Sequence, residues 1–101
     1  MIVCHKSWCG ACRALKPKFE SSKDIEALSV GFVLISLEDD NLPKDPKYMP
    51  DGDYVPRVLF LNTQAKVMTE IINESGSHEY KYFYSEPEHI VRSMKKALGV
   101  A

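Results

Sequence analysis

The chain is 101 residues long, which fits one compact domain, and 45% of its residues are hydrophobic, as in a protein with a packed core. Its net charge at pH 7 is −1, so electrostatics gives no reason to expect a nucleic acid or an anionic membrane as a partner. No apolar run approaches the roughly 20 residues of a membrane-spanning helix. Three cysteines, all within the first twelve residues, are too few and too clustered for a disulfide-stapled fold.

The first part of the chain predicts a strand, a helix and a second strand. Met1–His5 is short and largely apolar, as in a buried strand. A helix is expected from Cys9 to Ser22, because apolar residues recur on one face at helical spacing, and Pro17 should kink this helix rather than end it. Phe32–Leu37 is apolar almost throughout, a pattern typical of a central parallel strand that is covered on both faces.

The middle of the chain predicts a long loop and two further strands. Residues 38–54 are rich in Asp, Pro and Gly and should form the loop, with about one helical turn in it. The acidic start of this loop, Glu38–Asp40, is interpreted as a solvated face, since it lacks the ligand spacing of a calcium site. Arg57–Leu61 predicts a buried strand, and Val67–Ile72 predicts a strand antiparallel to it.

A last helix is predicted after Ser85. We expect Ser85 to be the N-cap, Glu88 to complete a capping box, and Pro87 to lie in the first turn. Gly99 is placed to end the helix. The order of elements predicts an α/β fold, with one mixed central β-sheet flanked by helices in a single domain over residues 1–101.

The chemistry of the chain is concentrated in the stretch Cys9-Gly10-Ala11-Cys12. A disulfide across two intervening residues closes a small ring and is easier to reduce than a structural disulfide. Cys9 is expected at the helix N-terminus, where free N–H groups and the helix dipole favour a thiolate, and Cys12 is expected one turn further on and more buried. We therefore predict that Cys9 attacks a substrate disulfide and that Cys12 then attacks Cys9 and releases the product.

Residues around the two cysteines are candidates for supporting roles. Trp8 offers a flat apolar platform beside the Cys9 sulfur, and Gly10, with Ala11 next to it, allows a substrate backbone to come close. Lys6 is expected to favour the Cys9 thiolate further. His5 is interpreted as a residue that tunes this thiolate or as a histidine satisfied within its strand.

Two other classes of function stay open at this point. Zinc sites use the same cysteine spacing, and Cys4 and His5 could complete a set of four ligands. The chain has no second C-x-x-C or H-x-x-H, however, and neighbouring strand residues point to opposite faces, so we expect no metal ion and interpret Cys4 as a buried core thiol. Dithiol-disulfide exchange needs no organic cofactor, and we expect none. The other alternative is a client-binding module or chaperone that uses the loop at Pro56 and the aromatic segment Tyr80–Tyr84, although packing within the protein is the favoured interpretation of that segment.

Several stretches resemble a known family. The motif from Trp8 to Cys12, followed by Pro17, resembles the active-site helix of thioredoxin-fold proteins. Val55-Pro56-Arg57 resembles their cis-proline loop, which faces the dithiol and would expose the Val55 backbone for pairing with a bound peptide. The stretches ALKPKF, LEDD, PDGDYVPRVLFL and EIINESG extend the resemblance to a small endoplasmic-reticulum member of the anterior gradient and protein disulfide isomerase group.

This resemblance implies a thioredoxin-like domain and a thiol-disulfide oxidoreductase of the endoplasmic reticulum lumen. Its partners would be protein clients with disulfides or thiols, and it could couple to glutathione. Val3 stands where many family members carry a buried acid that moves the proton of the second cysteine. The strand and helix that usually precede the first strand are expected to be missing, and we see no signal peptide and no retention tail.

Overall fold

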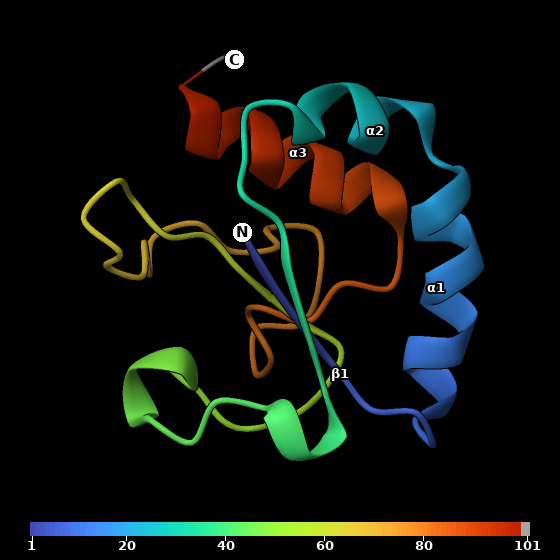
Figure 1. Cartoon of the computed structure of the whole chain (residues 1–101), viewed down its shortest axis with the longest axis vertical. Helices are drawn as coiled ribbons and strands as arrows, with labels where there is room; N and C mark the ends of the chain where they lie inside the picture. The colour runs from blue at the N-terminus through green and yellow to red at the C-terminus, as the bar shows by residue number, and fades with distance from the viewer. Residues whose placement is uncertain (100–101) are drawn as a thin grey trace.

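The computed structural model of the chain describes residues 1–99, so the last two residues of the predicted domain lie outside the described part. A three-stranded sheet lies at the centre of the molecule. Helix α1 (Gly10–Ser21) runs along one side of the sheet, and α2 (Lys23–Ser29) and α3 (Pro87–Leu98) lie across its top in the view of Figure 1. Within residues 1–99, no helix has the length and apolar character needed to cross a membrane.

The middle strand of the sheet is β1 (Ile2–His5). It pairs in parallel with β2 (Ile35–Glu38) and antiparallel with β3 (Arg57–Leu59), which gives the strand order β2-β1-β3. Burial alternates along β1: Cys4 is fully buried, whereas His5 is half-buried on the opposite face. The predicted α/β fold with a mixed sheet and flanking helices is confirmed.

The prediction that Phe32–Leu37 forms a central strand covered on both faces is wrong. The strand begins later, at Ile35, and lies at an edge of the sheet. Ile35 is 42% exposed and Val33, just before the strand, is 79% exposed, while Phe32 packs against the core. The apolar run is therefore split between the core and the surface, because its first residues connect α2 to the sheet instead of pairing with β1.

The prediction of a further strand at Val67–Ile72 is also wrong. Within residues 1–99 this segment forms an isolated antiparallel bridge, between Val67 and Leu61, and the Met68 N–H donates to Phe60 O at 2.7 Å. The Ile71 N–H then donates to Met68 O at 3.1 Å, so the chain turns before a second pair of residues can form. Ile71 nevertheless reaches the core, as an apolar residue of this segment should.

The segment before β3 contains two short 3₁₀ turns, Asp39–Asn41 and Pro46–Tyr48, where we expected about one helical turn. The Asp45 carboxylate accepts a hydrogen bond from the Lys47 N–H and begins the second turn. The long loop is therefore an ordered path from the end of β2 to the start of β3.

The predicted first helix is confirmed as α1, with Pro17 inside it. Helix α2, which follows directly, was not predicted from the sequence. Ser22 is the C-cap of α1 and also the N-cap of α2, where its hydroxyl accepts a hydrogen bond from the Ile25 N–H at 3.2 Å. Asp24 in the first turn of α2 suits the positive end of a helix dipole, so a cap signal was present at this position.

The start of α3 differs from the expected one, and its end agrees with it. The N-cap is Glu86, not Ser85, and it makes no side-chain capping bond, so the predicted capping box does not form. Pro87, as the first helical residue, fixes the start because its missing N–H would have no partner there anyway. Gly99 is the C-cap, with a φ of 79° in the left-handed region, as predicted.

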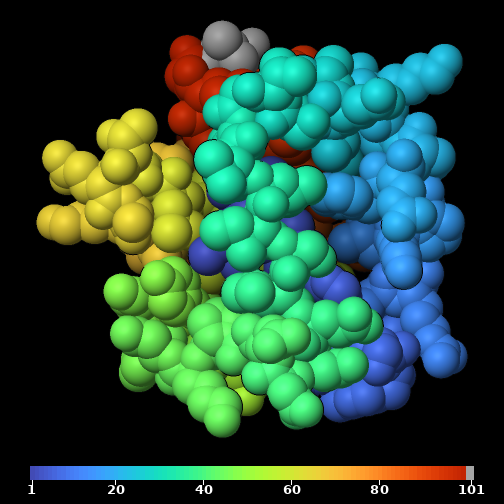
Figure 2. Space-filling view, viewed as in Figure 1, coloured from blue at the N-terminus to red at the C-terminus, as the bar shows by residue number. Residues whose placement is uncertain are grey.

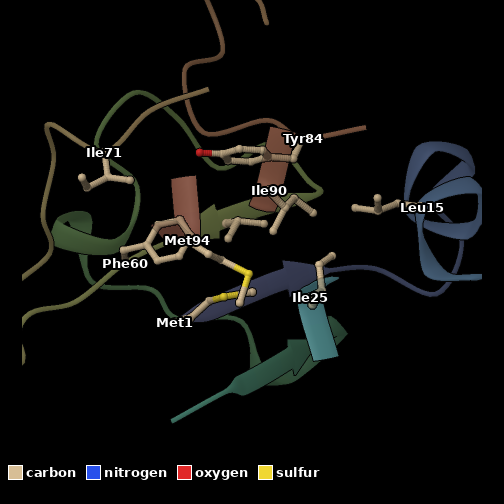
Figure 3. Packing of buried hydrophobic residues seen from close by; sticks show 9 residues of the cluster. Met1, Leu15, Ile25, Phe60, Ile71, Tyr84, Ile90 and Met94 are labelled. Atoms are coloured by element: carbon tan, nitrogen blue, oxygen red, sulfur yellow. The ribbon is translucent and has the colours of Figure 1, made fainter. Parts of the chain in front are cut away.

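The main core lies between the sheet and α3. Figure 3 shows Ile90 and Met94 of α3 pointing toward Met1 and Phe60, with Tyr84 beside them. These five side chains are between 0% and 6% exposed. The predicted packing of the aromatic segment is confirmed for Tyr84, which is fully buried.

Candidate functional site

Cys9 and Cys12 lie where β1 leads into α1. Cys9 is the N-cap of the helix, and its sulfur accepts a hydrogen bond from the Cys12 N–H at 3.2 Å. A sulfur at this position faces the unpaired N–H groups and the positive end of the helix dipole, which favour negative charge. The structure contains both thiols in the free, reduced form.

The two cysteines differ in exposure as predicted. Cys9 is half-buried, whereas Cys12 is 7% exposed. Burial, and after it the hydrogen bond with the Cys9 thiol, raises the pKa of Cys12 to about 11. Cys12 is therefore a protonated thiol at neutral pH, and the more accessible Cys9 is the sulfur that a substrate meets first.

The Val55–Pro56 segment lies opposite Cys9, although 46 residues separate the two in sequence. The Val55–Pro56 peptide bond is cis. The Cys9 thiol donates to Val55 O, with a sulfur–oxygen distance of 3.7 Å. The structure thus brings the cysteine motif and the proline loop together, as the sequence interpretation requires.

The turn that carries Trp8 is fixed by two charged residues. Asp39 accepts hydrogen bonds from the Ser7 N–H at 3.0 Å and from the Ser7 hydroxyl at 2.9 Å, and Arg13 Nε donates to Ser7 O at 3.1 Å. Asp39 has a φ of 52°, in the left-handed region that Asp tolerates better than most residues. Interpreting Glu38–Asp40 as a merely solvated face missed this role, which arises from a contact across 32 residues.

The exposed Trp8 and the half-buried Lys6 form a pair near the start of α1. The Trp8 side chain is 71% exposed, and the Lys6 ammonium lies 5.0 Å from the centre of its ring. This distance is within the range of a cation–π contact, which holds the charge of Lys6 over the indole. A Cβ added at Gly10 would meet nothing within 4 Å, so the surface next to Trp8 is open, and Ala11 beside it is half-buried.

A groove of about 560 Å³ lies between α1 and β2 and reaches the second cysteine. Figure 2 shows the surface hollowed between the teal and green residues of β2 and the blue residues of α1. Its lining includes Val3, His5, Cys12, Leu15, Leu34 and Pro56. His5 Nε2 lies 2.6 Å from Ser36 Oγ on the neighbouring strand, so the histidine is tied to β2 while facing the groove.

Cys4 lies apart from the dithiol, on the other face of β1. It is fully buried, as predicted, and packs with Leu59 and Tyr82. Burial raises the pKa of Cys4, and the neighbouring Arg57 opposes that shift. Cys4 and His5 point to opposite faces of β1, and within residues 1–99 no group of three or more His, Cys, Asp or Glu side chains is arranged to hold a metal ion.

Comparison with known proteins identifies the class. A family model described as Thioredoxin-like matches residues 1–63, more than half of the chain. The chain therefore belongs to the thioredoxin-like family, in agreement with its sheet, its cysteine pair at the start of a helix and the cis-proline opposite.

Among curated proteins, the chain is similar to the anterior gradient proteins. Anterior gradient protein 2 homolog of Homo sapiens is 34% identical over 98 residues, which are 97% of this chain and 55% of the relative. Anterior gradient protein 2-B of Xenopus laevis is 31% identical over 98 residues, covering 97% and 58%. Anterior gradient protein 3 of Mus musculus is 30% identical over 99 residues, covering 97% and 59%. The chain thus spans between 55% and 59% of the length of these relatives.

Proposed function

We propose that the chain is a thiol-disulfide oxidoreductase that acts on protein disulfides through Cys9 and Cys12. The observation that carries the proposal is the position of Cys9. Its sulfur caps a helix N-terminus, accepts the Cys12 N–H and faces Val55 O from a half-buried surface position. A buried structural thiol would need none of these features: the helix N-terminus and the Cys12 N–H favour a nucleophilic thiolate, and the position opposite Val55 O places the sulfur beside the backbone that would bind a client.

The proposed exchange has two steps. The Cys9 thiolate attacks one sulfur of a client disulfide, so that a mixed disulfide forms while the client S–S bond breaks and the leaving sulfur takes up a proton. The Cys12 thiolate then attacks Cys9 Sγ, which releases the second client sulfur to be protonated and leaves a Cys9–Cys12 disulfide. Two electrons and two protons have passed to the client. Two molecules of a small thiol such as glutathione would return the enzyme to the dithiol and become one disulfide.

The second step requires that Cys12 lose its proton. With a pKa of about 11, this thiol needs an acceptor at neutral pH. Val3 supplies no carboxylate at the position where the resemblance would place one. We propose that water in the groove between α1 and β2 receives the proton. His5, Glu20 and Glu38 line the same groove and are the candidates to accept the proton from this water.

Clients would bind across the surface that Cys9 shares with the proline loop. The Val55 backbone would pair with an extended client segment, and Trp8 would cover its apolar side chains. Gly10 and Ala11 leave room for the client backbone, and Lys6, whose ammonium lies over the Trp8 ring, would add positive charge to this surface. These contacts use backbone and flat apolar surfaces, so they suit clients of varied sequence.

The location and the relationship to one member of the group are part of the same proposal. The stretches quoted above resemble thioredoxin domain-containing protein 12, and the matches to anterior gradient proteins support membership of that group. We propose the endoplasmic reticulum lumen as its compartment, where client disulfides form and persist.

A client-binding module without turnover is the second candidate, because Trp8 is 71% exposed and Tyr80 is 48% exposed. Aromatic side chains are enriched at protein interfaces, so each of these two could contact a client.

A trapping experiment separates the two candidates. Cys12→Ala retains the attacking sulfur and lacks the releasing one, so it should accumulate covalent client complexes that dithiothreitol dissolves, while turnover on protein disulfides falls by about 10³-fold or more. Cys9→Ala is the matched control and should trap nothing. Equal client protection by both variants, with no trapped complex on non-reducing gels, would establish the binding module instead.

A further inference from the structure

Arg57 begins β3, immediately after the cis-proline, and is buried to an unusual degree for an arginine. Its side chain is 1% exposed. Among residues 1–99, the three ion pairs of the structure do not include it. Burying a cation without a carboxylate partner is costly unless other groups satisfy it. The hydrogen bonds that the guanidinium of Arg57 donates therefore show which groups it holds in place.

Those bonds go to two backbone carbonyls in the segment that leads to the active site. Arg57 Nε donates to Tyr48 O at 3.1 Å, and Nη1 donates to Tyr54 O at 2.6 Å. Tyr48 ends the second 3₁₀ turn, and Tyr54 directly precedes Val55, whose carbonyl faces Cys9 at 3.7 Å. One planar guanidinium thus ties two points of the long loop to β3, next to the backbone group that faces the nucleophile.

The side chain of Tyr54 is held as well as its carbonyl. Its hydroxyl donates to Asp51 Oδ1 at 2.5 Å and accepts a hydrogen bond from the Tyr82 N–H at 3.0 Å. Asp51 in turn accepts the Lys81 N–H at 2.8 Å. Both the backbone and the side chain of Tyr54 are therefore held in place. Arg57 of β3 binds its carbonyl, and Asp51, which is bonded to the C-terminal part of the chain, binds its hydroxyl.

We propose that Arg57 is a positioning residue for the exchange reaction: by holding Tyr54 O, it keeps the Val55 backbone at the distance from Cys9 at which a bound peptide disulfide lies in line for attack. The proposal rests on the proposed function and goes beyond it, since Arg57 touches neither the reacting sulfurs nor the client. Its consequence is selective. Exchange with a peptide depends on the Val55 backbone, whereas alkylation of Cys9 by a small reagent does not.

The test compares these two reactions in the same variants. Arg57→Lys keeps the charge and loses the fork of donors, and Arg57→Gln loses both. For each, the rate of exchange with a disulfide-linked model peptide should fall about ten- to a hundredfold, because small misplacements of reacting groups have effects of this size. The rate at which iodoacetamide labels Cys9, followed by mass spectrometry, should stay within about twofold of the wild-type rate, because this reagent makes no contact with the loop.

Two further variants complete the design. Arg92→Lys alters a surface arginine whose partner is the Ser75 hydroxyl, and it should change neither rate. Tyr54→Phe keeps the carbonyl and the ring but loses the bonds of the hydroxyl, so it should show the same selective loss to a smaller degree. It also carries the test if a variant of Arg57 does not fold.

The outcomes are distinguishable from one another. Selective loss of peptide exchange supports the positioning role. A parallel fall of both rates would show general damage to the site and overturn it, and so would unchanged peptide exchange in the Arg57 and Tyr54 variants. If the wild-type protein itself exchanged no disulfide with the peptide, the proposed function would fail, and the role of Arg57 with it.

Discussion

The two edges of the sheet are covered very differently. On one side, Val58 and Leu59 of β3 are 0% exposed, and the Val58 N–H donates to Tyr82 O at 3.0 Å, so a further segment of backbone lies along this edge. On the other side, β2 carries Ile35, which is 42% exposed, and follows Val33, which is 79% exposed. The β3 side is thus a packed interior, and the β2 side is a surface with a groove beneath it.

Because the two edges are covered differently, the part of the molecule that stabilises the fold is not the part that contains the reactive thiols. The core between β3 and α3 contains the most deeply buried apolar side chains, so most of the hydrophobic stabilisation arises there. Cys12 lies on the other side and lines the groove between α1 and β2. Cys12 must exchange a proton with water, which an incompletely covered edge of the sheet allows. Arg57 must hold the loop in place, which a tightly packed strand allows.

The largest expected difference between the edges concerns stability. Leu59→Ala in β3 should lower the free energy of unfolding by about 2–5 kcal/mol, because it removes a fully buried side chain and leaves a cavity. Leu34→Ala makes the same change beside β2, where the side chain is 44% exposed, and should cost less than about 1 kcal/mol. Urea denaturation of both variants measures the two values. Equal costs would show that the β2 side is covered in solution.

A smaller difference is expected between the two buried thiols. In Cys9→Ser, iodoacetamide should label Cys12 about tenfold faster for each unit of pH below its pKa, because the thiolate is the reacting form and the groove admits the reagent. That pKa should be lower than the value of about 11 in the intact dithiol, because the Cys9 thiol contributes to raising it. Cys4, enclosed on the β3 side, should stay unlabelled until the protein unfolds. Adding His5→Gln should lower the labelling of Cys12 near neutral pH if His5 assists its deprotonation, and an unchanged rate would remove His5 from the mechanism.

The smallest effect concerns a hydroxyl in the packed core. Tyr84 OH lies 2.7 Å from Ser93 Oγ, and Tyr84→Phe should cost about 1 kcal/mol at neutral pH, the worth of one hydrogen bond. Burial raises the pKa of Tyr84 to about 12. Because the folded state prefers the protonated phenol, stability should be constant below pH 10 and fall as the pH rises from 10 to 12. The free energy of unfolding, measured by denaturation at each pH, should fall less steeply across this range in Tyr84→Phe than in the wild type. It should still fall, because the pKa values of Cys12 and Tyr82 are raised as well, and an unaltered slope would contradict the assignment.

The parts of the molecule that were predictable from the sequence are those set by short-range patterns. The spacing of Cys9 and Cys12 before an amphipathic stretch places one sulfur at a helix start, and Gly99 ends a helix for local steric reasons. Pro56 could be placed opposite the cysteines through the family resemblance, which supplies a long-range relation that spacing alone does not contain.

The parts that were not predictable depend on what packs against what. An apolar run such as Phe32–Leu37 can form either a central strand or an edge strand. Which of the two it forms depends on whether other strands pair with it on both sides, and the run itself does not contain that information. Asp39 acts through a contact to backbone 32 residues away, which no local pattern reveals. Arg57 bonds to nearby carbonyls, but only because the preceding loop folds back onto β3, and no residue pattern of the loop indicates that path. Ser22 shows the opposite case, because its capping signal was local and could have been used to predict α2.

The capping role of Cys9 couples the reaction to the order of the helix itself. Caps are usually Ser, Thr, Asp or Asn, whose oxygens keep the same charge throughout a protein's life. The sulfur of Cys9 instead changes from a charged acceptor to half of a disulfide each time it reacts, and the Cys12 N–H then has a weaker partner. The coupling is reciprocal: the free energy by which the ordered helix end stabilises the charged sulfur equals the free energy by which the charged sulfur stabilises the ordered helix end. Order in the first turn of α1 and the thiolate fraction of Cys9 should therefore rise and fall together, so that fraying of this turn lowers the reactivity of Cys9.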